Sequence, residues 1–163
     1  MQRESEAFWT DERMVCLEGI AAGFSRQQAV TLASIVEQET QYAPERPAVA
    51  GMYINRLRCG MPLQADPTVK FAVGDFGIKR IMLHHLAVES PYNTYRHAGL
   101  PPGPICLPSL SSIDAVLHYA HHNYLYMCAK EDFSGSHNFA TTYAEHLRNA
   151  KKYADALDKR GIK

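Results

Sequence analysis

The stretch SPYNTYRHAGLPPGPICLPSL, residues 90–110, limits the possible folds of this chain more than any other segment. It contains five prolines. Because proline removes a backbone donor and fixes φ, no regular helix or strand can run through this stretch. Loops of this length in compact domains are usually functional. We therefore expect a long proline-rich loop that contributes side chains to a site.

Apolar periodicity and capping signals predict helices on both sides of this loop. Ser25 with Gln28 three residues later forms a capping box, and Phe24 can pack onto the first turn. That helix should end near Tyr42, since Pro44 disfavours helical geometry in the residue before it. Residues 60–77 read as turns and short segments. Further helices are expected over residues 5–22, 45–58, 78–87, 111–121 and 142–159.

A small sheet is expected late in the chain. Residues 124–130, YLYMCAK, alternate as a strand does, and HNFAT (137–141) can pair with them as an antiparallel neighbour across a turn at 132–136. Helices first and a short sheet later predict an α+β fold, a mostly helical single domain over residues 1–163. A chain of this length can bury a core. No apolar run approaches the roughly 20 residues that span a bilayer.

Charge and cysteine usage narrow the function classes. Lysine plus arginine and aspartate plus glutamate number 17 each, so no excess of positive charge points to nucleic acid. The cysteines are scattered without a C-x-x-C pair, which argues against a thiolate metal site. We expect four free and mostly buried thiols. These are Cys16, Cys59, Cys106 and Cys128.

The segment HYAHH raises the question of a metal site. His118, His121 and His122 have the i, i+3, i+4 spacing that can place imidazoles on one helix face. An H-E-x-x-H arrangement is absent and no nearby carboxylate completes a ligand set. We expect a solvated or helix-terminal cluster, with no metal and no other cofactor.

Two glutamates end the helix that begins at Ser25, and its periodicity separates them. At about 100° per residue, Glu39 falls on the apolar stripe of Ile35 and Val36. Glu37 projects about 200° away from it, so the two carboxylates cannot face one substrate bond together. A carboxyl group in an apolar stripe is costly to ionise, and its raised pKa suits a general acid.

A structural interpretation of Glu39 competes with the catalytic one. A glutamate in the last turn of a helix can also pair with an arginine such as Arg46 or Arg56. Glu37 is more simply a solvated or salt-bridged carboxylate. Periodicity alone leaves both interpretations of Glu39 open.

Four segments together resemble a known family. ASIVEQET (33–40), VAGMYINRLRCGMPLQADPTV (49–69), SPYNTYRHAGLPPGPI (90–105) and HNFATTYAEH (137–146) are similar, in order and spacing, to the catalytic domain of the endolytic murein transglycosylases, the YceG-like family. The resemblance covers roughly residues 28–155. It implies a lysozyme-like catalytic helix and makes Glu39 the catalytic residue, the one that the helical argument also favours.

The resemblance implies cleavage of peptidoglycan strands between N-acetylmuramic acid and N-acetylglucosamine. Glu39 would act first as acid and then as base, leaving a 1,6-anhydro end. Two alternatives stay open: a water-using muramidase, for which Asp66 is the tempting second carboxylate, and an inactive peptidoglycan-binding module.

The matched positions around Glu39 predict a sugar-binding groove. Short polar groups in a proline-fixed turn suit hydroxyls, and tyrosines with an amide suit N-acetylated sugars. Bracing of the turn, self-packing of the loop and a core histidine are the structural alternatives. The predicted substrate-binding residues are Gln64, Asp66, Thr68, Tyr92, Asn93, Tyr95, His137 and Phe139.

Family resemblance also sets expectations for the parent protein. Its members carry an N-terminal membrane helix and a small LysM-like domain, so this chain is expected to be the catalytic part of a longer protein. The parent would be anchored by a single span in the bacterial inner membrane, with this domain on the periplasmic side. Expected partners are peptidoglycan strands and peptidoglycan polymerases such as penicillin-binding proteins, with no nucleic acid.

Overall fold

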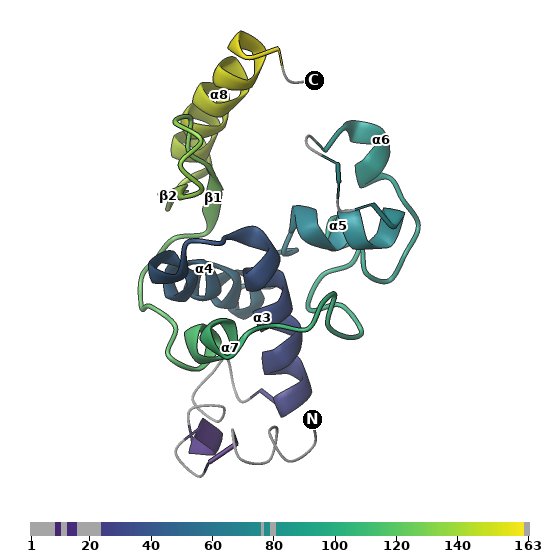
Figure 1. Ribbon diagram of the computed structural model, residues 1–163, viewed down its shortest axis with the longest axis vertical. Coiled ribbons are helices and arrows are strands. Elements are labelled where there is room, and N and C mark those ends of the chain that lie inside the picture. Colours follow the sequence, from purple (N-terminus) through teal and green to yellow (C-terminus); the bar gives the residue numbers. More distant parts are fainter. Residues whose placement is uncertain (1–8, 11–12, 16–23, 76, 79–80, 162–163) are drawn as a thin grey trace.

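The computed structural model describes residues 9–10, 13–15, 24–75, 77–78 and 81–161. Its order of elements confirms the expected α+β class, with helices first and one antiparallel hairpin late (Figure 1). The helix predicted over residues 5–22 lies mostly outside the described residues. The elements are α3 (Arg26–Glu39), η1 (Ala43–Glu45), α4 (Arg46–Arg58), α5 (Asp66–Val73), α6 (Leu83–Leu86), α7 (Leu110–Leu117), β1 (Tyr126–Ala129), β2 (His137–Ala140) and α8 (Tyr143–Lys159).

Helix α3 starts as its capping box predicts and ends earlier than expected. The Ser25 hydroxyl accepts from the Gln28 amide at 3.1 Å, and the Gln28 side chain accepts from the Ser25 amide at 2.9 Å. At the other end, Thr40 takes an extended backbone with φ −146° and ψ 133°. Glu39 is therefore the last residue of the helix, at the point where the chain turns away.

The core is built around α3. Leu32, Ile35 and Val36 are fully buried, and α3 packs against α7, α4 and α5. Helix α4 follows the short η1 turn, close to the predicted 45–58. At Gly51, α4 comes very close to the segment after α7, where the Ala120 amide donates to the Pro47 carbonyl at 3.0 Å. This contact locks α4 and α7 into one body.

Three further helices differ from the predictions. Residues 66–73 form α5 where turns were expected, because Pro67 sits in the first turn, a position where its missing amide costs nothing. Helix α7 begins at Leu110, one residue before the predicted 111–121, because Ser109 is the N-cap and accepts from the Ser112 amide, and it ends four residues early at Leu117. Helix α6 covers only part of the predicted 78–87.

The late part of the chain forms an arm beside the body. Strands β1 and β2 pair antiparallel, as predicted, with Met127 opposite Phe139, and Thr142 caps α8 by accepting from the Glu145 amide. Figure 1 shows α8 and the hairpin on one side of the body and α5 with α6 on the other. Residues 87–109 contain neither helix nor strand, as their prolines predict. Within the described residues, no helix has the length and apolar character needed to cross a bilayer.

The close approach at Gly51 generates a stability prediction. A methyl group at this position would overlap the Ala120 carbonyl oxygen and stand 2.9 Å from Nε2 of His122. We expect Gly51→Ala to lower the free energy of unfolding by about 1–3 kcal/mol, although alanine is the better helix former. Urea denaturation measures this change. Gly103→Ala is the control, because its added methyl would meet only the Tyr92 hydroxyl at 3.4 Å. A neutral or stabilising Gly51→Ala would contradict the proposed packing.

Candidate active site

A cleft of about 470 Å³ opens where α3 ends at Glu39. Its walls come from segments far apart in the sequence, with α4 and α5 on one side and the hairpin with α8 on the other. The polar and ionisable residues that line it are Gln38, Glu39, Tyr53, Arg56, Gln64, Asp66, Lys70, Tyr95, Cys128, His137, His146 and Tyr153. This is the candidate active site.

Glu39 is the carboxyl group best suited to donate a proton here. Burial, and then the nearby charge of Asp66, raises its pKa from 4.5 to about 7. His137, a hydrogen bond from the Tyr53 hydroxyl and Lys70 act in the opposite direction. A group with this pKa exists in both protonation states near neutral pH, which general acid–base catalysis requires. The catalytic role itself stays a prediction.

Asp66 faces Glu39 from the first turn of α5. The Tyr95 hydroxyl donates to Oδ1 of Asp66 at 2.6 Å. Burial raises the pKa of Asp66, and the bond from Tyr95 and the charge of Lys70 oppose this rise. Asp66 as a residue is exposed along the cleft, but protein atoms surround its carboxylate, and this burial is what raises the pKa. Asp66 thus helps Glu39 to hold its proton.

Glu37 has the opposite environment. Its Oε1 accepts from the Ser112 hydroxyl at 2.6 Å, the Ser109 hydroxyl at 2.7 Å and the Ser109 amide at 3.0 Å. Burial alone would raise its pKa, but these bonds and Arg46, 3.5 Å away, lower it. Glu37 is therefore an ionised brace between α3 and α7. The prediction that the two glutamates face different surroundings is confirmed.

The arginine interpretation of Glu39 is not what the structure shows. Arg46 pairs with Glu37. Arg56 donates to the backbone carbonyls of Leu125, Pro62 and Leu63 at 2.6, 2.9 and 3.2 Å. Neither guanidinium serves as the ion-pair partner of Glu39.

His137 enters the cleft from β2 and is tied to Glu45 at the start of α4. Its amide donates to Oε1 of Glu45 at 2.6 Å, and its Nδ1 lies 2.8 Å from Oε2. The Thr40 hydroxyl donates to the same Oε2 at 3.1 Å. Four of the eight predicted groove residues line the cleft with Glu39: Gln64, Asp66, Tyr95 and His137.

Asn93 and Thr68, predicted to bind substrate, lie in the interior and do not line the cleft. Both are fully buried. The Asn93 amide donates to the carbonyls of Leu86 and Val88 at 2.9 and 2.8 Å, and its oxygen accepts from the Tyr95 amide at 3.0 Å. The Thr68 hydroxyl donates to the Ala65 carbonyl at 2.7 Å. These groups brace the loop and the start of α5, and they have no surface to offer a sugar.

Tyr92 and Phe139 are not brought to Glu39 either. The Tyr92 ring packs on Phe71 with centroids 4.7 Å apart. Phe139 stacks on Tyr124 at 5.4 Å. Both rings stay partly buried against the core, and neither lines the cleft.

Sequence reasoning missed three groups near Glu39. Nothing in the sequence around Tyr53 indicates its hydrogen bond to Glu39. Lys70 lies four residues after Asp66, and recognising α5 as a helix would have placed both on one face. Glu45 carries no local sign of its pairing with His137, because the two are far apart in the sequence.

The histidine and cysteine expectations are only partly met. Helix α7 ends at Leu117, so the helical spacing of HYAHH is not realised. His122 instead accepts from the Tyr124 amide through Nδ1 and donates to the Ala48 carbonyl through Nε2 at 2.9 Å. In the described part of the chain, no group of three histidine, cysteine or acidic residues is arranged to hold a metal. Three thiols are free, and none of the three is fully buried, contrary to expectation: Cys59, Cys106 and Cys128. Cys16 lies outside the described residues.

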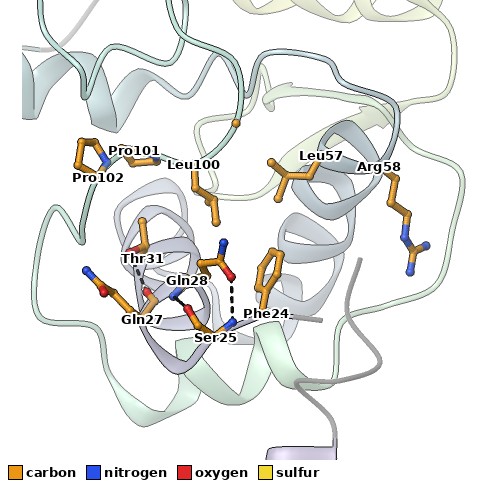
Figure 2. Close-up of a pocket in the computed structure, with 11 residues that line it drawn as sticks. Phe24, Ser25, Gln27, Gln28, Thr31, Leu57, Arg58, Leu100, Pro101 and Pro102 are labelled. Atoms are coloured by element: carbon orange, nitrogen blue, oxygen red, sulfur yellow. Dashed lines mark hydrogen bonds between the residues drawn. The ribbon is translucent and has the colours of Figure 1, made fainter. Parts of the chain in front are cut away.

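A larger hollow of about 1000 Å³ lies at the opposite end of α3 (Figure 2). Phe24, Leu57 and Leu100 point toward it, and the capping box of α3 forms its floor. Of its lining residues, only Arg58 carries an ionisable side chain. It therefore offers no acid–base pair, and the smaller cleft at Glu39 is the better candidate despite its size.

The buried amide of Asn93 generates a second stability prediction. Asn93→Ala leaves the Leu86 and Val88 carbonyls without their donor, so we expect the free energy of unfolding to fall by about 2–4 kcal/mol. Asn138→Ala, which removes one amide bonded to the exposed Glu131 at 3.0 Å, should cost less than about 1 kcal/mol. Urea denaturation of both variants distinguishes a brace from a groove residue: equal, small losses would reject the brace.

The two glutamates predict opposite pH dependences of stability. The pKa of Glu39 in the folded protein lies above its ordinary value. The contribution of Glu39 to the free energy of unfolding is therefore complete below pH 4.5 and is lost as pH rises through about 7. Glu39→Gln should therefore gain on the wild type over that range, by up to about 3 kcal/mol. Glu37→Gln should lose stability relative to the wild type above the ordinary pKa of Glu37 and match it in acid, since the folded pKa is lowered. Melting temperatures from pH 4 to 8.5 test both signs, and parallel curves would refute the assignment.

Comparison with known proteins places this geometry in a family. The chain matches the YceG-like family over residues 1–152. It is 38% identical over 136 residues to the endolytic murein transglycosylase of Bacillus subtilis, which covers 83% of this chain and 37% of that protein. It is 32% identical over 133 residues to the endolytic murein transglycosylase of Streptococcus pneumoniae serotype 2, covering 79% and 24%.

A solved structure agrees. The crystal structure of a yceG-like protein from Listeria monocytogenes matches with a TM-score of 0.72 and 38% identity, over 77% of this chain and 40% of that one. The chain thus spans between 24% and 40% of the length of these relatives. The family match over most of its length shows that this chain belongs to the YceG-like family.

Proposed function

We propose that this domain is a lytic transglycosylase that cleaves the glycan strands of bacterial peptidoglycan. The observation that carries the proposal is one carboxyl group, Glu39, whose pKa burial and Asp66 raise to about 7 in a cleft lined by polar side chains. The names of the relatives, endolytic murein transglycosylases, support the substrate class.

The proposed reaction needs a single group that gives and then takes a proton. Neutral Glu39 protonates the oxygen that joins C1 of N-acetylmuramic acid to N-acetylglucosamine, and the C1–O bond breaks. The C6 hydroxyl of the same muramyl residue then attacks C1, and the Glu39 carboxylate accepts its proton. A 1,6-anhydro ring and a free N-acetylglucosamine hydroxyl result, no water is consumed, and Glu39 ends protonated as it began.

Asp66 is the reason to keep a muramidase as the second candidate. Its carboxylate faces Glu39 across the cleft and is oriented by Tyr95. In an inverting hydrolase a second carboxylate activates water, and in a retaining one it attacks C1 itself. In the transglycosylase, Asp66 instead raises the proton affinity of Glu39 and can stabilise positive charge on the sugar ring.

We also propose that the domain works on the wall-facing side of the bacterial membrane, within a longer, membrane-anchored parent that acts beside peptidoglycan polymerases. Peptidoglycan lies outside the cytoplasmic membrane, and the greater length of the relatives fits a parent with further segments.

The test is the product and its dependence on Glu39. Purified glycan strands are digested in ¹⁸O-labelled water and analysed by mass spectrometry. We expect 1,6-anhydro ends without ¹⁸O, and a fall of about 10²–10⁴-fold in rate for Glu39→Gln, as for a lost general acid. Glu37→Gln is the matched control and should keep the chemistry.

The alternative outcomes are distinct. Reducing ends carrying ¹⁸O would identify a muramidase and give Asp66 the second role. Loss of cleavage in a folded Glu37→Gln with near-normal turnover in Glu39→Gln would show that the wrong glutamate was chosen. Binding of strands without cleavage would leave a peptidoglycan-binding module.

A further inference from the structure

A buried ion pair lies directly behind the end of the catalytic helix. The side chains of His137 and Glu45 are only 9% and 8% exposed, and Nδ1 of His137 lies 2.8 Å from Oε2 of Glu45. The amide of His137 binds the other carboxylate oxygen at 2.6 Å. Thr40, the residue after Glu39, donates its hydroxyl to Oε2 at 3.1 Å. Glu45 thus holds β2 and the end of α3 together at one carboxylate.

The surroundings favour the charged form of both partners. Burial alone would raise the pKa of Glu45, but the hydrogen bonds from the His137 ring and amide and from Thr40 lower it. Burial would lower the pKa of His137, but the bond to Glu45 and the charges of Glu39 and Glu45 raise it. Both shifts favour a carboxylate paired with an imidazolium ring.

The ring has one nitrogen left for the cleft. Nδ1 is occupied by Glu45, and the hydrogen bonds of the ring to other described residues involve Nδ1 alone. His137 lines the same cleft as Glu39, and each shifts the charge state of the other. The Nε2–H donor is thus available on the side where Glu39 and a substrate would lie.

We propose that Glu45 is a positioning residue that holds His137 as a cation beside Glu39, where it offsets the charge of Asp66 and keeps Glu39 able both to give and to take a proton near neutral pH. The inference rests on the proposed acid–base role of Glu39. It assigns a function to Glu45, which does not line the cleft, and gives His137 an electrostatic role that sugar binding does not require.

The other groups that line the cleft around Glu39 supply few positive charges that could offset Asp66. From α4, Tyr53 donates a hydrogen bond to Glu39, and Arg56 is engaged with backbone carbonyls. From α5, Asp66 raises the pKa of Glu39 and Lys70 lowers it.

The remaining walls contribute no further cation. Tyr95 from the loop is bound to Asp66. On β1, burial raises the pKa of Cys128, so its thiol is neutral. On α8, burial and then Arg56 lower the pKa of His146, and Tyr153 is a phenol. Among the described residues that line the cleft, His137 is thus the one whose positive charge is stabilised by a buried carboxylate, that of Glu45.

The imidazolium matters most after the first proton transfer. Glu39 is then a carboxylate in a largely buried place, next to the carboxylate of Asp66, and a neighbouring cation stabilises that state. Without the cation, Glu39 would hold its proton more tightly and become a weaker acid, and the rate of bond cleavage would fall as Brønsted behaviour requires.

The experiment compares Glu45→Gln with the matched control Glu37→Gln. Both substitutions remove a hydrogen-bonded carboxylate, but Glu37 is bonded to Ser109 and Ser112 and not to His137. The pH dependence of kcat/KM is measured on purified glycan strands from pH 5 to 9. We expect the alkaline limb to move up by at least about 0.5 pH unit and the maximum to fall about 10-fold in Glu45→Gln. In Glu37→Gln the limb should stay in place. A folded Glu45→Gln with an unmoved limb, or an equal shift in both variants, would overturn the proposal.

A second measurement needs neither activity nor a Glu45 variant. With ¹³C-labelled histidine, NMR titration of the wild type should show His137 titrating above its ordinary 6.5, and Glu39→Gln should lower that value by at least about 0.3 unit. A wild-type His137 that titrates at or below 6.5, or does not respond to Glu39→Gln, rejects the proposal. If the wild type cuts no glycan strand, the proposed function fails, and this titration still decides whether the pair acts on Glu39.

Discussion

The cluster around Glu37 is the interaction on which the rest of the site depends. Oε1 of Glu37 accepts hydrogen bonds from two serine hydroxyls and one backbone amide, and Oε2 pairs with Arg46. These bonds fix α3 against α7 and against the end of the proline-rich loop. Because α3 is rigid, fixing Glu37 on one side also fixes the direction of Glu39 on the other. The structural glutamate therefore fastens α3 to α7, and Glu37→Gln keeps a side-chain oxygen that can accept the same three bonds, so the direction of Glu39 does not depend on the charge of Glu37.

Two carboxyl groups two residues apart have opposite pKa shifts because their surroundings differ in hydrogen-bond donors. Burial acts on both in the same direction. Donors from Ser109 and Ser112 compensate it at Glu37, whereas at Glu39 one tyrosine, one histidine and one lysine compensate it only in part and Asp66 adds to it. The two-residue spacing on a helix points Glu37 and Glu39 in different directions, and the residues that each meets on other elements determine its pKa.

The capping box at Ser25, the hairpin and the direction of Glu39 could all be predicted from the sequence, because each depends on contacts within a few residues or on helix periodicity. Helix α5 was missed because Asp66-Pro67 suits a turn as well as a first helical turn. Asn93 was misplaced for a different reason. A proline-rich loop has no periodicity, so nothing local shows which side of it faces the core. The Glu45–His137 pair joins residues 92 positions apart, a separation that propensity and motif cannot bridge.

The two walls of the cleft come from distant parts of the chain, and this separation determines when during folding the cleft is complete. Glu39 lies early, while β1, β2 and α8, which close the other side, lie between residues 126 and 159. Until that arm docks, one wall of the cleft is missing, and Glu39 lacks the burial and the charge of His137 that this wall supplies. Contacts over such sequence distances form late, because their loop-closure entropy must be overcome first. A partly synthesised or partly folded chain therefore lacks the complete cleft, and the proposed acid reaches its full environment only when the last segments have folded.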